Sequence, residues 1–211
     1  MAVRKNGDNF PSGKMGNINT YLLKTQIISR VIGKTNKPAT VPQLVCRQKF
    51  DVLGHFLKPV KPFINVGFDL VTRGTKWSPI NKATSVNYSN AIKGEFPHQE
   101  IDYSKAILTM GNMPSVENVD VQVVDGGLEF SWDPNWKIGN MLSSDRVMLL
   151  AYCPAKCTAF FILDGEKRSK GKEQLEILPS QDKVNLHTYL AFIAADRKRI
   201  STSIYTGEIC Y

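Results

Sequence analysis

The residues best suited to chemistry are the four cysteines, of which Cys153 and Cys157 form the closest pair. Zinc sites usually need two such pairs of close ligands. Cys46 and Cys210 are single and remote, so the sequence supplies only one pair. We interpret Cys153 and Cys157 as neighbours across a hairpin turn that hold no metal, and all four cysteines as reduced thiols.

Histidines and glycines form no catalytic motif either. His55, His98 and His187 lie far apart in the sequence, and none stands beside a Ser or Cys in a recognised nucleophile motif. Gly7 and Gly13 are separated by five residues, whereas a phosphate-binding loop requires four. The sequence therefore predicts a protein that is not an enzyme, with no cofactor and no identified small-molecule substrate.

The positive charge is concentrated near the N-terminus. The formal net charge is +8, and residues 1–60 contain ten Lys and Arg against two Asp. Residues 105–211 contain twelve Lys and Arg against thirteen Asp and Glu. A basic segment on a neutral body predicts an acidic partner, which is nucleic acid, another subunit or a surface. The basic run 167–172 is interpreted as a solvated loop, with a phosphate-backbone contact as the alternative.

Two short elements precede the body of the protein. Residues 1–17 are rich in Gly, Asn and Lys, and we expect them to form a loosely ordered arm. Residues 18–33 contain two apolar runs around a turn and predict a β-hairpin. A lone hairpin is only marginally stable in water, so this one must pack on the rest of the chain or pair with another molecule. The candidate interaction residues lie in and near these elements: Lys14, Tyr21, Lys24, Ile27, Arg30 and Arg47.

Residues 41–58 predict a helix that begins with a capping box at Thr40 and Gln43. Its apolar stripe follows at spacings of 4, 3, 4 and 3 residues: Cys46, Phe50, Leu53, Leu57 and Val60. A second helix is expected over residues 79–94, with Ser78 as its N-cap.

From residue 105 onward the pattern is that of β-strands. Residues 119–132 alternate apolar and polar side chains on both sides of a turn, which predicts a hairpin with Trp132 in the core. Seven to eight short strands over residues 105–211 predict an immunoglobulin- or fibronectin-like β-sandwich. The expected fold class is α+β, with a basic arm, hairpin and small two-helix unit in residues 1–104 and the sandwich domain in residues 105–211.

The sequence predicts neither a membrane span nor a secretion signal. No run approaches about 18 apolar residues, and the basic residues at the N-terminus are not followed by an apolar run. We expect a soluble protein made in the cytoplasm, which would reach any extracellular or phage-derived assembly by lysis or a dedicated machine.

Several stretches resemble an uncharacterised family of the Bacteroidota, a domain of unknown function. They are SGKMGNINTY, KPATVPQLVCRQKFDVLGHFLKPVKPFINVGF, IDYSKAILTMGNMP, GLEFSWD, DRVMLLAY and the closing HTYLAFIAADRKRISTSIYTGEICY. The N-terminal half is also similar to small phage-associated proteins that carry a helix after a basic hairpin. The resemblance implies a component of a virion, tail-like particle or surface filament, and it brings no catalytic residues.

The function predicted from these features is that of a non-enzymatic structural or assembly protein, in which the 18–33 hairpin contacts a neighbouring subunit. The alternative is a nucleic-acid-binding protein that uses the basic N-terminal region. Aromatic residues are scarce among those basic residues, which argues mildly against the alternative.

Overall fold

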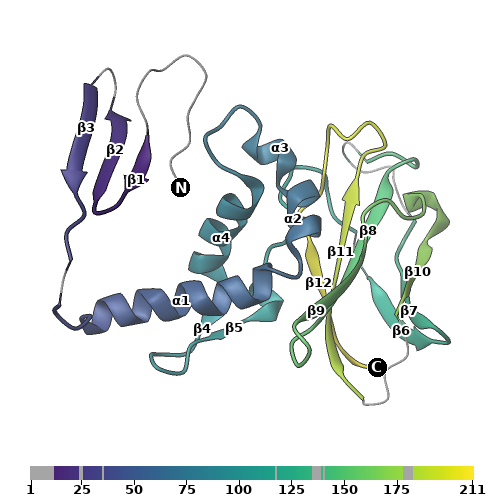
Figure 1. Ribbon diagram of the computed structural model, residues 1–211. Helices are drawn as coiled ribbons and strands as arrows, with labels where there is room; N and C mark the ends of the chain where they lie inside the picture. Colours follow the sequence, from purple (N-terminus) through teal and green to yellow (C-terminus); the bar gives the residue numbers. More distant parts are fainter. Residues whose placement is uncertain are drawn as a thin grey trace. The chain divides into compact units, whose positions relative to one another are not determined.

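A computed structural model describes residues 12–23, 26–34, 36–116, 118–134, 139, 141–177 and 183–211 (Figure 1). The fold class is α+β, and these residues form four helices and several antiparallel sheets. The chain divides into two compact units, residues 1–40 and 41–211. This division differs from the expected boundary at 104/105, because the helices of residues 41–90 share a hydrophobic core with the larger sheet that follows them.

The first unit is a three-stranded antiparallel sheet of β1 (Gly13–Met15), β2 (Ile18–Leu23) and β3 (Gln26–Val31), in that order. The predicted hairpin is confirmed as β2 and β3. The loose arm expected over residues 1–17 is wrong for residues 13–15, which pair with β2 across a two-residue turn. Gly16 begins this turn with φ +60°, a conformation that glycine adopts readily. Residues 1–11 of the expected arm lie outside the described residues.

Both predicted helices are present in the second unit, as α1 (Val41–Leu57) and α4 (Pro79–Asn90). The Ser78 hydroxyl accepts a hydrogen bond from the Asn81 N–H at 3.3 Å, as expected of an N-cap. Two short helices, α2 (Lys61–Gly67) and α3 (Asp69–Thr72), enlarge the expected two-helix unit. Pro62 stands in the first turn of α2, where the N–H group that proline lacks would have no partner within the helix. The proline is therefore compatible with the start of this helix.

Seven strands form the two large sheets of the second unit. They are β6 (Asp120–Val124), β7 (Gly127–Ser131), β8 (Arg146–Cys153), β9 (Thr158–Ile162), β10 (Lys172–Glu176), β11 (Asn185–Ile193) and β12 (Ile204–Cys210). One sheet has the order β10-β7-β6 and the other the order β12-β11-β8-β9. In an immunoglobulin constant-type domain, the fourth strand belongs to the same sheet as the first, second and fifth strands. The fourth strand of the two large sheets here is β9, and it pairs with the third strand, β8, in the other sheet. The immunoglobulin- or fibronectin-like assignment stays a prediction.

The smaller elements are the strand pair β4 (Ile92–Lys93) and β5 (Glu100–Ile101) and the 3-10 turns η1 (Tyr103–Lys105) and η2 (Arg168–Lys170). Residues 106–110 lie in the region where strands are expected, but they belong to no ladder of the described chain. The N–H groups of Leu108 and Thr109 donate instead to the Ser203 hydroxyl, at 2.9 and 3.3 Å. Side-chain bonds of this kind replace the ladder bonds of a strand.

Two hydrophobic cores lie on opposite faces of the larger sheet. One core joins it to the β10-β7-β6 sheet and contains Phe130, Trp132 and Phe192. The other joins it to the helices and contains Leu53 and Tyr189. Strands β8 and β11 are therefore covered on both faces, which explains their almost continuous apolar sequences. Trp132 is buried edge-on against Phe192, so its predicted core position is confirmed.

One residue of the basic run 167–172 lies inside the protein, contrary to the interpretation of a wholly solvated loop. The Arg168 side chain is fully buried, with its guanidinium carbon 3.7 Å from the centre of the Phe192 ring. Its Nε atom lies 3.6 Å from Oδ2 of Asp145, which is also fully buried. Burial lowers the pKa of Arg168 to about 10, and the Asp145 carboxylate opposes this shift. Arg168 therefore carries its charge between the two sheets at neutral pH.

Candidate functional site

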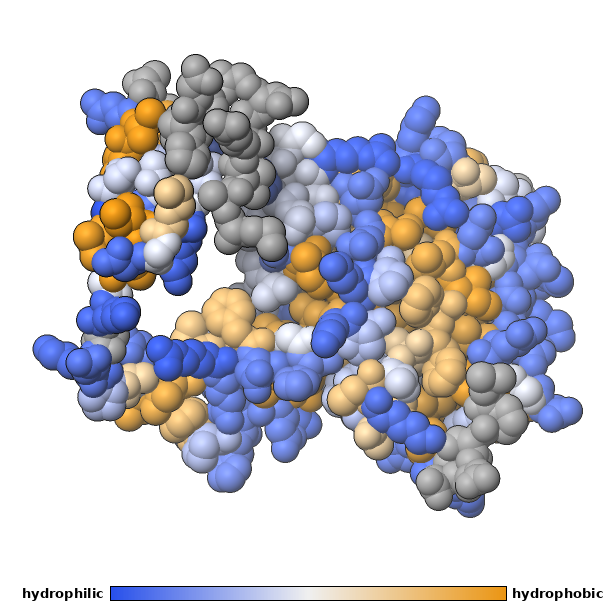
Figure 2. Space-filling model, viewed as in Figure 1, coloured by the Kyte–Doolittle hydropathy of each residue, from blue (hydrophilic) through white to orange (hydrophobic). Residues whose placement is uncertain are grey.

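The β1–β3 sheet has an apolar face that is open to solvent. The register places Met15 and Val31 beside Ile18, and Leu22 opposite Ile27, so these side chains point to one side. Each of these residues is exposed to solvent over a large fraction of its surface: Met15 by 58%, Ile18 by 42%, Leu22 by 47%, Ile27 by 55% and Val31 by 67%. Figure 2 shows apolar atoms in orange on this sheet. We call these five residues the aliphatic face.

The centre of the aliphatic face is a pair of hydroxyl groups. Thr20 and Ser29 are register partners, and their hydroxyl oxygens lie 2.9 Å apart. One hydroxyl donates to the other, so this bond pairs part of the polar surface at the centre of the face.

The opposite face of the same sheet is basic. Lys14 and Arg30 both stand opposite Asn19 on neighbouring strands. The guanidinium of Arg30 lies 5.3 Å from the centre of the Tyr21 ring, within the range of a cation–π contact. Lys14, Asn19 and Arg30 also line a hollow of about 420 Å³ next to Gly33. Three of the six predicted interaction residues, Lys14, Tyr21 and Arg30, are thus brought together.

The other three predicted residues lie elsewhere. Ile27 belongs to the aliphatic face, on the other side of the sheet. Lys24 lies outside the described residues. Arg47 belongs to α1 in the second unit, where it lines a shallow hollow together with Cys46 and Phe50.

A second candidate site, missed in the sequence, is a cleft of about 520 Å³ between α1 and the larger sheet. Phe56, Tyr103 and Tyr152 pack in mutual contact in its wall, with ring centres 5.0–5.8 Å apart. His55 and His187 both line it, although they are distant in the sequence. His187 stands opposite Tyr152 in the β8–β11 register. That register depends on the tertiary fold, so no sequence spacing could reveal the grouping.

Burial determines the protonation states of the His187 and Tyr152 side chains in this cleft. Desolvation lowers the pKa of His187, nearby Lys93 lowers it further, and Glu208 only partly opposes the shift. The imidazole stacks on Tyr103 with ring centres 3.9 Å apart, and its Nδ1 lies 3.0 Å from the Tyr205 hydroxyl. Burial also raises the pKa of Tyr152 well above its usual range. Both groups are therefore neutral at pH 7.

The contacts of the thiols and histidines in this cleft are those of packing groups in the described part of the chain. Cys157 is exposed in the turn between β8 and β9, whereas Cys153 is buried in β8. Among the residues the structure describes, neither His55 nor His187 makes a hydrogen bond to the Cys157 thiol. A thiol without a neighbouring base gains no nucleophilic activation from one. The geometry fits aromatic packing between the helices and the sheet.

The described part of the chain contains no group of three or more His, Cys, Asp or Glu side chains arranged to hold a metal ion. None of the helices in the described ranges is both long enough and apolar enough to cross a membrane.

A family model matches residues 12–207. The chain belongs to the family of unknown function DUF6266. The family spans both compact units, so the β1–β3 sheet is part of it and not an appendage. The resemblance to an uncharacterised family is confirmed at this level. Neither the curated proteins nor the solved structures contain a match to the chain.

Proposed function

We propose that the protein is a non-enzymatic assembly subunit that binds a second copy of itself through the aliphatic face of its β1–β3 sheet. The observation that carries the proposal is the exposure of five aliphatic side chains on one side of a small sheet. Contiguous apolar surface of this kind marks interaction sites. A three-stranded sheet also gains most of its stability from covering such a face.

The arrangement of charge favours a second copy as the occupant. Two aliphatic faces can pack against each other as two sheets do in a sandwich, about 10 Å apart, in a self-complementary contact. Lys14 and Arg30 lie on the opposite face of the sheet. They remain in water when the aliphatic faces meet, so the contact buries no unpaired charge.

In the wider form of the proposal, the protein is a repeating subunit of a filament, virion or tail-like particle. Strand β3 is an edge of its sheet, and a six-residue edge can accept a strand from another molecule. A face contact combined with an edge contact would extend dimers into a larger assembly. An extracellular or phage-derived location and an origin in the Bacteroidota belong to this proposal and rest on resemblance.

The test measures the mass of the full-length protein in solution over a wide range of concentration. The wild type is expected to dimerise or assemble further, and the Leu22→Thr/Ile27→Thr variant to remain a monomer. Thr keeps the β-propensity of these positions and removes apolar area. Ile28→Thr, on the opposite face of the same strand, is the matched control and should assemble like the wild type. A monomeric wild type, or a double variant that assembles normally, would refute the proposal.

A deletion of residues 1–33 provides a second test. The remaining chain keeps both hydrophobic cores, to which the described residues of the first unit contribute nothing. We expect it to fold and to be monomeric. A folded deletion variant that still assembles would place the contact elsewhere and overturn the proposal.

A further inference from the structure

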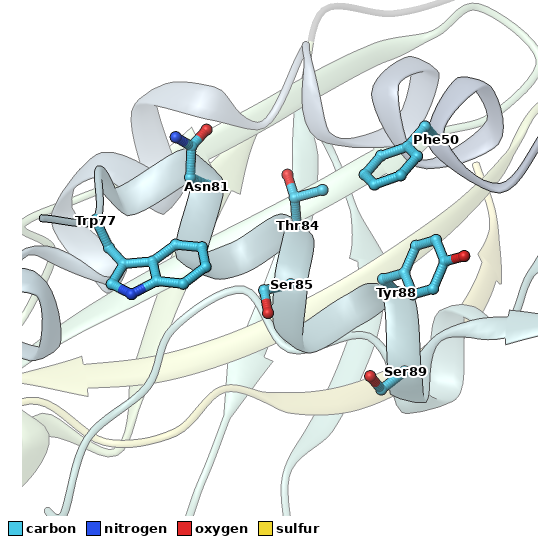
Figure 3. A pocket seen from close by; sticks show the side chains of 7 residues that line it. All are labelled: Phe50, Trp77, Asn81, Thr84, Ser85, Tyr88 and Ser89. Carbon is cyan, nitrogen blue, oxygen red and sulfur yellow. The ribbon is translucent and has the colours of Figure 1, made fainter. Parts of the chain in front are cut away.

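Helices α1 and α4 form a hollow of about 410 Å³ with aromatic rings at its ends (Figure 3). Phe50 comes from α1 and Tyr88 from α4, and their ring centres are 5.1 Å apart. Trp77, just before α4, stands at the other end. The side chains between the rings are uncharged hydrogen-bonding groups of α4: Asn81, Thr84, Ser85 and Ser89. We call this hollow the α1–α4 groove.

The rings in this groove are unusually exposed. Phe50 is exposed by 53% and Trp77 by 52%, and neither belongs to a hydrophobic core of the described chain. The apolar stripe of α1 predicted Phe50 to be buried, but burial begins only at Leu53. Large aromatic side chains usually bury most of their surface in a core or an interface. The two half-exposed rings that face this hollow are therefore available to stack on a flat ligand.

The surroundings of the groove are strongly basic. Residues 41–90 contain seven Lys and Arg against two Asp, a formal net charge of +5. Asp69 binds Arg73 at 2.6 Å, and Asp51 lies 3.7 Å from His55. The other six cations of this segment have no carboxylate within ion-pair distance among the described residues: Arg47, Lys49, Lys58, Lys61, Lys76 and Lys82.

Several of these cations border the aromatic rings. Lys58 and Lys61 line an adjoining hollow that shares Phe50 and Thr84 with the groove. Arg47 lines another hollow that also includes Phe50. The ammonium group of Lys49 lies 5.2 Å from the centre of the Tyr88 ring. The positive charges thus form a rim, and the uncharged hydroxyl and amide groups form the floor.

We propose that the α1–α4 groove binds single-stranded nucleic acid. Bases stack on Phe50 and Trp77, and phosphates face Lys58, Lys61 and Arg47. A positive groove combined with exposed aromatic rings is the usual design of single-strand binding surfaces, because each base offers a flat face and each nucleotide a negative charge. A duplex is a poorer fit, since its base faces are already stacked inside the helix.

This proposal places the nucleic-acid-binding surface on the helices, whereas the alternative function predicted from the sequence placed it in the basic N-terminal region. The scarcity of aromatic residues that weakened the alternative applies to residues 1–60, whereas the groove recruits Trp77 and Tyr88 from outside that range. The groove lies wholly within residues 41–211, so its function does not depend on assembly through the aliphatic face.

The experiment measures binding of the full-length protein to fluorescently labelled single-stranded oligonucleotides, to the matching duplex and to polyglutamate. Phe50→Ala and Trp77→Ala are each expected to weaken single-strand binding about five- to 150-fold, the effect of one lost stacking contact. Phe96→Ala, at an exposed aromatic residue outside the groove, should bind like the wild type. Far-UV circular dichroism verifies that each variant is folded.

The charge of the rim is tested separately through the dependence of affinity on salt. Lys58→Gln/Lys61→Gln should reduce the slope of log affinity against log salt by about 1.4, the value for two lost phosphate contacts on a single strand. Lys198→Gln, at an exposed position outside the groove, is the matched control. No binding to any single strand at low salt would overturn the proposal. Equal binding of duplex, or of polyglutamate with the same response to the aromatic variants, would overturn it too and assign the surface to a different acidic partner.

Discussion

The buried ion pair of Arg168 and Asp145 can be tested by removing only its negative charge. Asp145→Asn keeps an oxygen that can accept the hydrogen bond that the Leu142 N–H donates at 2.8 Å. It leaves the guanidinium of Arg168 with the face of Phe192 and with two weak contacts at 3.5 Å, to the Met113 sulfur and the Pro114 carbonyl oxygen. Asp145 is the one carboxylate within ion-pair distance of Arg168 in the described chain.

The expected loss follows from the complete burial of both side chains. Removing one partner of a buried ion pair costs about 3–5 kcal/mol, because the remaining charge is neither paired nor hydrated. We expect Asp145→Asn to lower the free energy of unfolding by this amount. Arg168→Met should cost less, because the carboxylate then retains the Leu142 N–H and Arg199, which lies 3.9 Å away.

The double variant separates the ion pair from simple packing. Arg168→Met/Asp145→Asn has no buried charge at this site, so it should be more stable than Asp145→Asn alone. Urea unfolding of the full-length protein, followed by tryptophan fluorescence and by circular dichroism, gives the three free energies. Trp132 is a suitable reporter because its indole N–H donates to the Arg168 carbonyl oxygen at 2.8 Å. A loss below about 1 kcal/mol for Asp145→Asn, or a double variant that loses the full sum of the single variants, would contradict the ion-pair interpretation.

Two further predictions concern the helix-covered face of the larger sheet. The lowered pKa of His187 means that the unfolded chain binds more protons as the pH falls through about 6.5, so stability should fall from pH 7 toward pH 5. Urea titrations at several pH values should show a shallower dependence for His187→Gln than for the wild type, and an unchanged dependence would contradict the prediction. Asn87→Ala should cost about 2–4 kcal/mol, because the buried amide bonds both the N–H and the carbonyl oxygen of Ile107 at 2.8 Å. Asn90→Ala, at the exposed end of α4, is its control and should match the wild type; equal losses in the two variants would contradict the prediction.

The sequence by itself determined the elements whose signals are local. Alternation at period two over residues 119–132 predicted β6 and β7, and the pattern after residue 105 predicted that the region is built of strands. The cap at Ser78 predicted the start of α4. Each of these signals is a property of neighbouring residues in the chain, such as side-chain alternation or a capping hydroxyl. A short window of sequence is therefore enough to predict the element.

Tertiary structure alone decided which residues of these elements are available for function. The apolar stripe of α1 is continuous in sequence, yet the Phe50 ring lies beside Tyr88 of α4 in an open hollow and stays half-exposed. Arg168 looked like its solvated neighbours until the η2 turn directed it between two sheets. His55 and His187 likewise line one cleft only because helix α1 packs on the larger sheet, and this packing is decided across the whole unit.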